Sequence, residues 1–90
     1  MGWTVVWLPG AEEELAELWL AALDRERVAL AADQIDKQLR RNPEQVGESR
    51  PAGRRILIMP PLAVTYRVLP DDLLVQVVNV RAFPIKDSNE

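Results

Sequence analysis

Two β-type runs and the turn between them decide the fold of this 90-residue sequence: LAVTYRVL (62–69), PDD (70–72) and LLVQVVNVR (73–81). Side chains alternate between the two faces of a strand. The first run therefore divides into an apolar face and a second, more mixed face: Leu62, Val64, Tyr66 and Val68 against Ala63, Thr65, Arg67 and Leu69. The run 73–81 is apolar on both sides, which is typical of a central strand. The stretch predicts two adjacent strands near the middle of a sheet.

Further β-type runs lie at 54–59, just before this pair, and at 3–8, near the start of the chain. Pro60-Pro61 separates 54–59 from the pair, and proline lacks the amide hydrogen that a strand ladder needs, so a turn is expected there. Pro9-Gly10 is a turn signal that should end the first run. The segment 43–53 holds two prolines and two glycines and is interpreted as a loop.

Between the β-type runs, apolar residues recur every three or four positions, which is the period of a helix. One such stripe begins at Ala11 and a second at Val28, and the phase is lost around 24–27. Two helices joined by a short turn are expected. The predicted fold is α+β with the order β-α-α-β-β-β: a helical hairpin packed on one face of a twisted, mainly antiparallel sheet. The opposite face is left for function.

Length and composition exclude several classes of protein. Ninety residues leave room for one domain, 1–90. The chain has no cysteine and no histidine, which excludes disulfide frameworks, histidine metal sites and His-based catalytic triads. We expect no cofactor and no metal, because the acidic run 12–14 is explained by its favourable place at a helix N-terminus. Apolar runs are far shorter than the roughly 20 residues that cross a bilayer, and no signal pattern is present, so a soluble, cytoplasmic protein is predicted.

Charge is distributed unevenly along the chain. Residues 1–36 hold two basic and eight acidic side chains, whereas residues 37–70 hold seven basic and two acidic ones. Nine of the eleven basic residues are arginine, whose planar fork of donors suits carboxylate or phosphate. The basic segment 37–70 is therefore the first place to look for a ligand. The alternative is that these side chains only pair with the acidic first half, and a net charge of −3 is unlike that of a dedicated nucleic-acid binder.

The order and spacing of these residues resemble the RelE/ParE-type toxins of bacterial type II toxin–antitoxin pairs. The resemblance covers about residues 3–83. In the first half it rests on Val6-Trp7-Leu8-Pro9, Ala11, Glu14-Leu15, Leu18-Trp19, Ala32, Ile35-Asp36, Leu39 and Pro43. In the second half it rests on Gly53-Arg54-Arg55, Pro61-Leu62, Val64, Tyr66-Arg67-Val68, Asp71-Asp72 and Val75-Gln76-Val77.

The resemblance implies one of two activities. RelE-like members cut mRNA in the ribosomal A site with basic side chains on the sheet, and ParE-like members block DNA gyrase by binding. Aligning Tyr66 with the family tyrosine puts Ala63 where the RNA cutters carry arginine and Leu57 at one of two basic positions; Phe83, near the end, has no ionisable group. The sequence thus leans against an enzyme and towards a ParE-like or divergent toxin. A RelE-like ribosome-dependent endoribonuclease and a non-toxic, antitoxin-binding remnant remain the alternatives.

Four arginines are the candidate binding residues: Arg54, Arg55, Arg67 and Arg81. Arg54 and Arg55 must leave opposite faces of their strand, and parity with Leu57 assigns Arg55 to the open face. Arg55 can match one basic position of the nuclease branch, so it and Arg81 are also the candidate catalytic residues.

Arg67 shares a face with the small Ala63 and Thr65, which allows a shallow basic groove; the alternative is an ion pair with the acidic turn 71–72. Arg81 lies where the last strand ends, a common place for functional side chains.

The predicted partner is a cognate antitoxin. An acidic, partly disordered segment could meet the basic stretch 37–70 while its apolar anchors contact the helical hairpin or an edge strand. DNA gyrase and the ribosome are the targets that the two branches imply. A homodimer or a toxin–antitoxin hetero-oligomer is expected, and a membrane partner is not.

Overall fold

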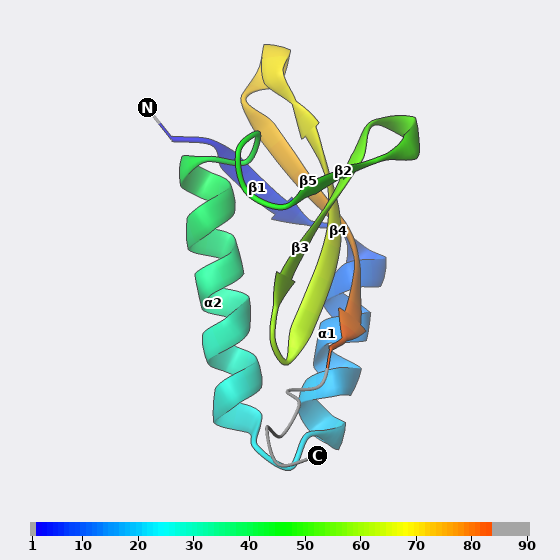
Figure 1. The fold of residues 1–90 in the computed structure, drawn as a ribbon. Helices are drawn as coiled ribbons and strands as arrows, with labels where there is room; N and C mark the ends of the chain where they lie inside the picture. Colours follow the sequence, from blue (N-terminus) through cyan, green and yellow to red (C-terminus); the bar gives the residue numbers. More distant parts are fainter. Residues whose placement is uncertain (1, 84–90) are drawn as a thin grey trace.

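The computed structural model describes residues 2–83 and contains two helices and five strands (Figure 1). Short turns at Pro51–Gly53 and Pro70–Asp72 join the strands on either side of them. The elements follow one another as β1 (Thr4–Trp7), α1 (Pro9–Ala21), α2 (Arg25–Arg41), β2 (Glu48–Arg50), β3 (Arg54–Met59), β4 (Leu62–Leu69) and β5 (Leu74–Ala82).

The strands form one mixed sheet in the order β1-β5-β4-β3-β2. β1 runs parallel to β5, and every other neighbouring pair is antiparallel. β5 lies between β1 and β4, which is the interior position that its apolar composition predicts. The predicted α+β fold and mainly antiparallel sheet are confirmed.

The segment 43–53 is more ordered than the predicted loop, because it contains the edge strand β2. β2 pairs antiparallel with β3, with Ser49 opposite Arg55. Gly47 makes the approach to this strand possible: its φ is +72°, and a Cβ there would lie 2.5 Å from the Ile56 carbonyl oxygen. All three residues of β2 are exposed, so the strand has no apolar alternation by which a pattern could reveal it.

Both helices begin where local chemistry favours a start. α1 begins at Pro9, two residues before the expected Ala11, because proline is tolerated at the first helical position, where its missing N–H would have no partner anyway. α2 follows Asp24, whose carboxylate accepts a hydrogen bond from the Arg27 amide at 3.2 Å. Pro9-Gly10 is thus the start of a helix and not a separate turn.

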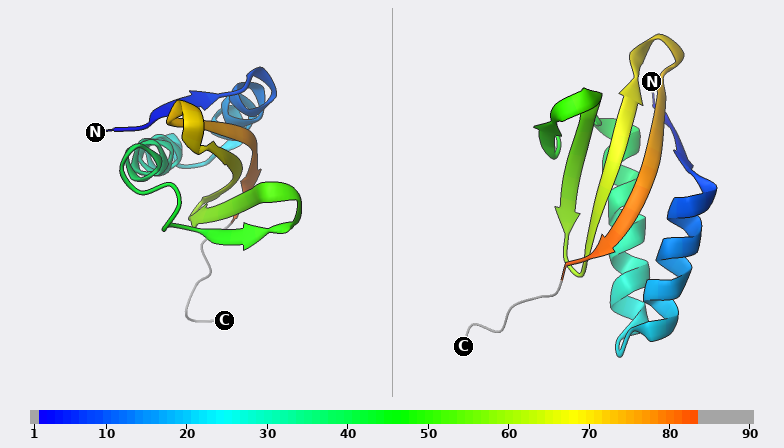
Figure 2. Two further views of the ribbon diagram at one scale, coloured as in Figure 1. Left: turned by 90° about the horizontal axis from the view of Figure 1, so that it is seen from above. Right: turned by 90° about the vertical axis from the view of Figure 1, so that its right-hand side faces the viewer.

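The two helices lie on one face of the sheet (Figure 2). α2 buries Val28, Ala31, Ile35 and Leu39 against the inward side chains of the sheet, which include Leu57, Val64, Tyr66, Val75 and Val77. We call the opposite side the open face. It carries the side chains that alternate with the buried ones, among them Arg54, Ile56 and Ile58 on β3, Ala63, Thr65, Arg67 and Leu69 on β4, and Leu74 and Gln76 on β5.

Within residues 2–83, neither helix is long and apolar enough to span a membrane.

The core placement of α2 is tested by shortening one buried side chain. Ile35 is fully buried, so Ile35→Ala should lower the free energy of unfolding by about 2–5 kcal/mol. Leu30 on the same helix is 58% exposed, and Leu30→Ala should change it by less than about 0.5 kcal/mol. Urea denaturation measures both, and equal losses would contradict this packing.

Candidate functional site

Three arginines on three adjacent strands stand in one row across the open face. The strand registers place Arg50 opposite Arg54, and Arg54 opposite Arg67. On the next strand the row continues with Gln76. All three arginines are exposed. We call these three residues the arginine row.

The arginine row is short of counter-charge. Like charges placed directly opposite each other on neighbouring strands are destabilising. Arg50 pairs with Glu48 at 3.1 Å, but no ion pair among residues 2–83 involves Arg54 or Arg67. The predicted alternative for Arg67, a bridge to the acidic turn 71–72, is likewise not formed. The row therefore offers guanidinium donors to an outside anion.

Arg55 does not lie on the open face, and that expectation was wrong. Leu57 is buried under the helices, so its parity sends Arg55 to the covered face and Arg54 to the open one. There the Arg55 guanidinium donates hydrogen bonds to the carbonyl oxygens of Val46 (3.0 Å) and Gly47 (3.3 Å). Its donors hold the segment before β2 in place, which is a structural role.

Tyr66 shares this network and is fully buried, as its apolar parity predicted. Its hydroxyl donates one hydrogen bond that is shared between the carbonyl oxygens of Pro43 (2.9 Å) and Val46 (2.8 Å), and its oxygen accepts a hydrogen bond from Arg55 Nε at 3.3 Å. Burial raises the pKa of the Tyr66 phenol, although the neighbouring Arg55 opposes that shift. The phenol is thus kept protonated and occupied within the fold.

Arg81 lies at the end of β5, as predicted, but its charge is compensated. Its guanidinium contacts the Glu14 carboxylate of α1 at 2.6 Å. The other Glu14 oxygen accepts a hydrogen bond from the Val80 amide at 2.8 Å. The Val80 hydrogen bond, with help from Arg81, holds the pKa of the Glu14 carboxyl below its ordinary value. The structure therefore separates Arg81 from the arginine row and ties it to α1.

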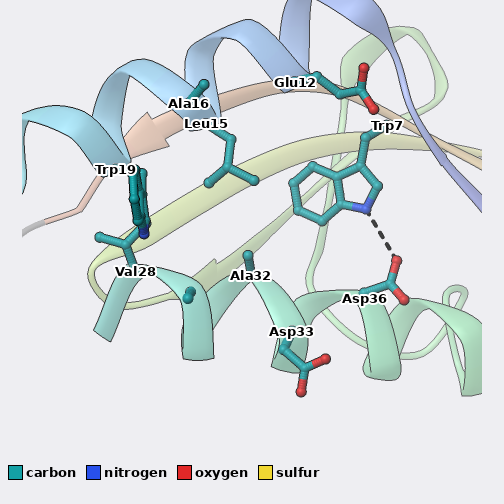
Figure 3. Close-up of a pocket in the computed structure, with 10 residues that line it drawn as sticks. Trp7, Glu12, Leu15, Ala16, Trp19, Val28, Ala32, Asp33 and Asp36 are labelled. Atoms are coloured by element: carbon teal, nitrogen blue, oxygen red, sulfur yellow. Dashed lines mark hydrogen bonds between the residues drawn. The ribbon is translucent and has the colours of Figure 1, made fainter. Parts of the chain in front are cut away.

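A second surface feature is an apolar groove of about 640 Å³ between α1 and α2. Trp7 and Trp19 stand towards its two ends, with Leu15 between them (Figure 3). The indole of Trp7 donates to Asp36 at 3.1 Å. Trp19 is 39% exposed. Its ring lies 4.7 Å from the Arg25 guanidinium, so it is held at the surface by a cation–π contact.

Sequence reasoning found two members of the arginine row, Arg54 and Arg67, and missed Arg50. Arg50 lies in the segment that was interpreted as a loop, and only the register of β2 brings it beside Arg54. The groove was not predicted, and small residues, Ala16, Ala29 and Ala32, are among those that line it. No cluster of acidic side chains within residues 2–83 is arranged to hold a metal ion.

Comparisons with known proteins identify the fold. No protein-family model matches the sequence, and no curated protein sequence matches it significantly. Among solved structures, the RelBE2 toxin–antitoxin complex from Mycobacterium tuberculosis contains a chain 21% identical to this one; the match covers 91% of this chain and 92% of that chain, with a TM-score of 0.75. The chain has a RelE/ParE-type toxin fold.

Two further solved structures share this fold. A chromosomal ParDE toxin–antitoxin system from Pseudomonas aeruginosa matches with 18% identity over 89% of this chain and 95% of that chain, at a TM-score of 0.70. TrmO from the same organism matches with 22% identity over 90% of this chain, at a TM-score of 0.63. Only 36% of the TrmO chain is covered, so there the fold is one part of a larger protein.

The contact between Glu14 and β5 makes stability depend on pH. Because folding lowers the pKa of Glu14, its contribution is fully present above the ordinary value of 4.5 and is lost as the pH falls through the lowered pKa. Glu14→Gln should therefore unfold at a lower temperature than the wild type at pH 7. The difference should shrink below pH 4.5.

Thermal unfolding from pH 7 to pH 3 measures this effect. Glu17→Gln is the matched control, because Glu17 is exposed on the same helix and makes no ion pair among residues 2–83. A Glu14→Gln difference that stays constant over the whole pH range would contradict the assignment.

Proposed function

We propose that this protein is the toxin of a bacterial type II toxin–antitoxin pair and that a cognate antitoxin neutralises it. The observation that carries the proposal is the fold match to two toxin–antitoxin complexes, which spans about nine-tenths of this chain and more than nine-tenths of each matched chain. As part of this proposal, residues 1–90 form one domain, and the protein acts in the cytoplasm.

We further propose that it acts by binding another protein, as ParE-like toxins do in blocking DNA gyrase, and not by cutting RNA. RNA cleavage needs cations to hold the scissile phosphate and a general acid or base beside it. Three positions of the open face that adjoin the arginine row or lie beyond it are apolar, namely Ile56 and Ile58 on β3 and Ala63 on β4, and Thr65 between them is not ionisable. The chain has no histidine, and the Tyr66 hydroxyl is engaged inside the fold.

The alternatives are a RelE-like ribosome-dependent endoribonuclease and a non-toxic, antitoxin-binding remnant. An endoribonuclease would have to use Arg81 and the arginine row, although the chain has no histidine to serve as a general acid or base near neutral pH. Arg81 is exposed enough for an RNA contact, but its guanidinium is paired with Glu14. The remnant would keep the fold and the surfaces that bind the antitoxin, and would lose only the ability to act on a cellular target.

The α1–α2 groove supports antitoxin binding. Apolar grooves between helices accept the apolar face of an amphipathic helix. The groove is lined mainly by aliphatic and aromatic side chains, and its volume of about 640 Å³ can hold several anchor side chains. Its edge carries the carboxylates of Glu12, Asp33 and Asp36, two of which already pair with Lys37 and Arg40.

Induced expression in bacteria tests the toxin assignment. The chain alone should arrest growth, and co-expression of the adjacent gene should restore it. A copy of the gene with an early frameshift controls for the burden of transcription. Growth arrest accompanied by a DNA-damage response, with translation intact, is the expected ParE-like result; unchanged growth with tight antitoxin binding would identify the remnant instead.

The absence of mRNA cleavage is tested in a purified translation system. We expect no cut in the ribosomal A site at a toxin concentration equal to that of the ribosomes. Specific cleavage that Arg81→Ala or Arg54→Ala abolishes would overturn the binding mechanism and establish the endoribonuclease.

A further inference from the structure

The arginine row has a geometry that suits one class of ligand. Neighbouring strands are about 4.8 Å apart, so the roots of the three side chains span about 9.6 Å at right angles to the strands. On an α-helix, carboxylates at positions i, i+4 and i+7 share one face and span about 10.5 Å along the axis. A helix that crosses the sheet at right angles to the strands can therefore place one carboxylate beside each arginine.

The surroundings of the row favour an amphipathic partner. Two residues along each strand on the same face, the row is flanked by Glu48, Ile56 and Thr65 on one side and by Leu69 and Leu74 on the other. Glu48 is already paired with Arg50. The aliphatic side chains of Ile56, Leu69 and Leu74 are partly exposed. A helix with a carboxylate stripe bordered by apolar residues would meet both the guanidinium groups and these flanks.

The same features disfavour nucleic acid as the ligand. Proteins that bind single strands stack bases on aromatic side chains, and none of the residues that flank the row on its strands is aromatic. The net charge of −3 also opposes attraction of a polyanion to the rest of the surface. Carboxylates confined to one helix face avoid that repulsion.

We propose that the arginine row, Arg50, Arg54 and Arg67, binds an acidic amphipathic helix of a partner protein that lies across the strands of the open face. The row is unfavourable in the free protein because Arg54 and Arg67 repel each other in a directly opposed pair. An acidic helix removes that repulsion and supplies bidentate guanidinium–carboxylate contacts. The inference rests on the proposed function in one respect: the antitoxin is the expected source of the helix.

The test uses the purified chain and two labelled helical peptides of identical composition. The first carries glutamates at i, i+4 and i+7, on one face, and the second at i, i+5 and i+6, spread around the helix. Fluorescence anisotropy should show at least ten-fold tighter binding of the first peptide. Binding of the first peptide should weaken as salt rises.

Variants assign the binding to the row. Arg54→Gln combined with Arg67→Gln should raise the Kd for the first peptide at least ten-fold. The matched control, Arg27→Gln combined with Arg41→Gln, changes the charge equally at exposed arginines of α2 and should raise the Kd less than two-fold. The first double variant should also unfold at the same or a higher temperature than the wild type, because it removes a like-charge pair.

Several outcomes would overturn the proposal. These are equal affinity for the two peptides, equal losses in the two double variants, a lower unfolding temperature of the row variant, or tighter binding of an oligouridylate of equal charge. None of these measurements involves growth. Arrest that an antitoxin relieves, without discrimination between the peptides, would therefore defeat this inference alone, whereas discrimination without arrest would defeat only the toxin assignment.

Discussion

The register of β4 between β3 and β5 is the constraint on which the other features depend. It is fixed by burial: Val64 and Tyr66 must face the helices, together with Val77 and Val80 of β5. A slip of one residue would turn these side chains outward and would move Arg67 under the helices. The same register places Arg54 opposite Arg67 on the open face. The arginine row is thus a consequence of core packing, and its charges face outward because the core faces inward.

The short length of β1 imposes a second requirement. β1 pairs with β5 only from Leu74 to Val77, so the rest of that edge of β5 needs another cover. α1 provides it, and the Glu14 carboxylate accepts the Val80 amide that a longer β1 would have paired. This placement also brings Glu14 to Arg81. The strand end that the sequence marked as functional is therefore engaged in holding a helix against the sheet edge.

Periodicity was sufficient to predict the helices, the four longer strands and the mainly antiparallel sheet, because each buries a regular apolar face. It failed where structure depends on contacts that leave no period. The path into β2 is set by Gly47 and by hydrogen bonds from Arg55 and Tyr66 to carbonyl groups, none of which a pattern records. Parity with Leu57 assigns Arg55 to the open face only if Leu57 is a functional position. The apolar character of Leu57 is the sign in the sequence that this side of the strand is buried.

In the structure, most of the basic side chains of residues 37–70 fall into two groups, one paired within the protein and one exposed on the open face. Lys37 and Arg40 pair with Asp33 and Asp36 along α2, and Arg55 is taken up by backbone carbonyls, so internal pairing accounts for part of the surplus. The arginine row places three more of these basic side chains on the open face, while carboxylates lie along the edge of the groove on the helical side. The two faces thus differ in sign. One partner segment that covers both must change its own charge along its length, which makes a wrapping partner more selective than either face alone.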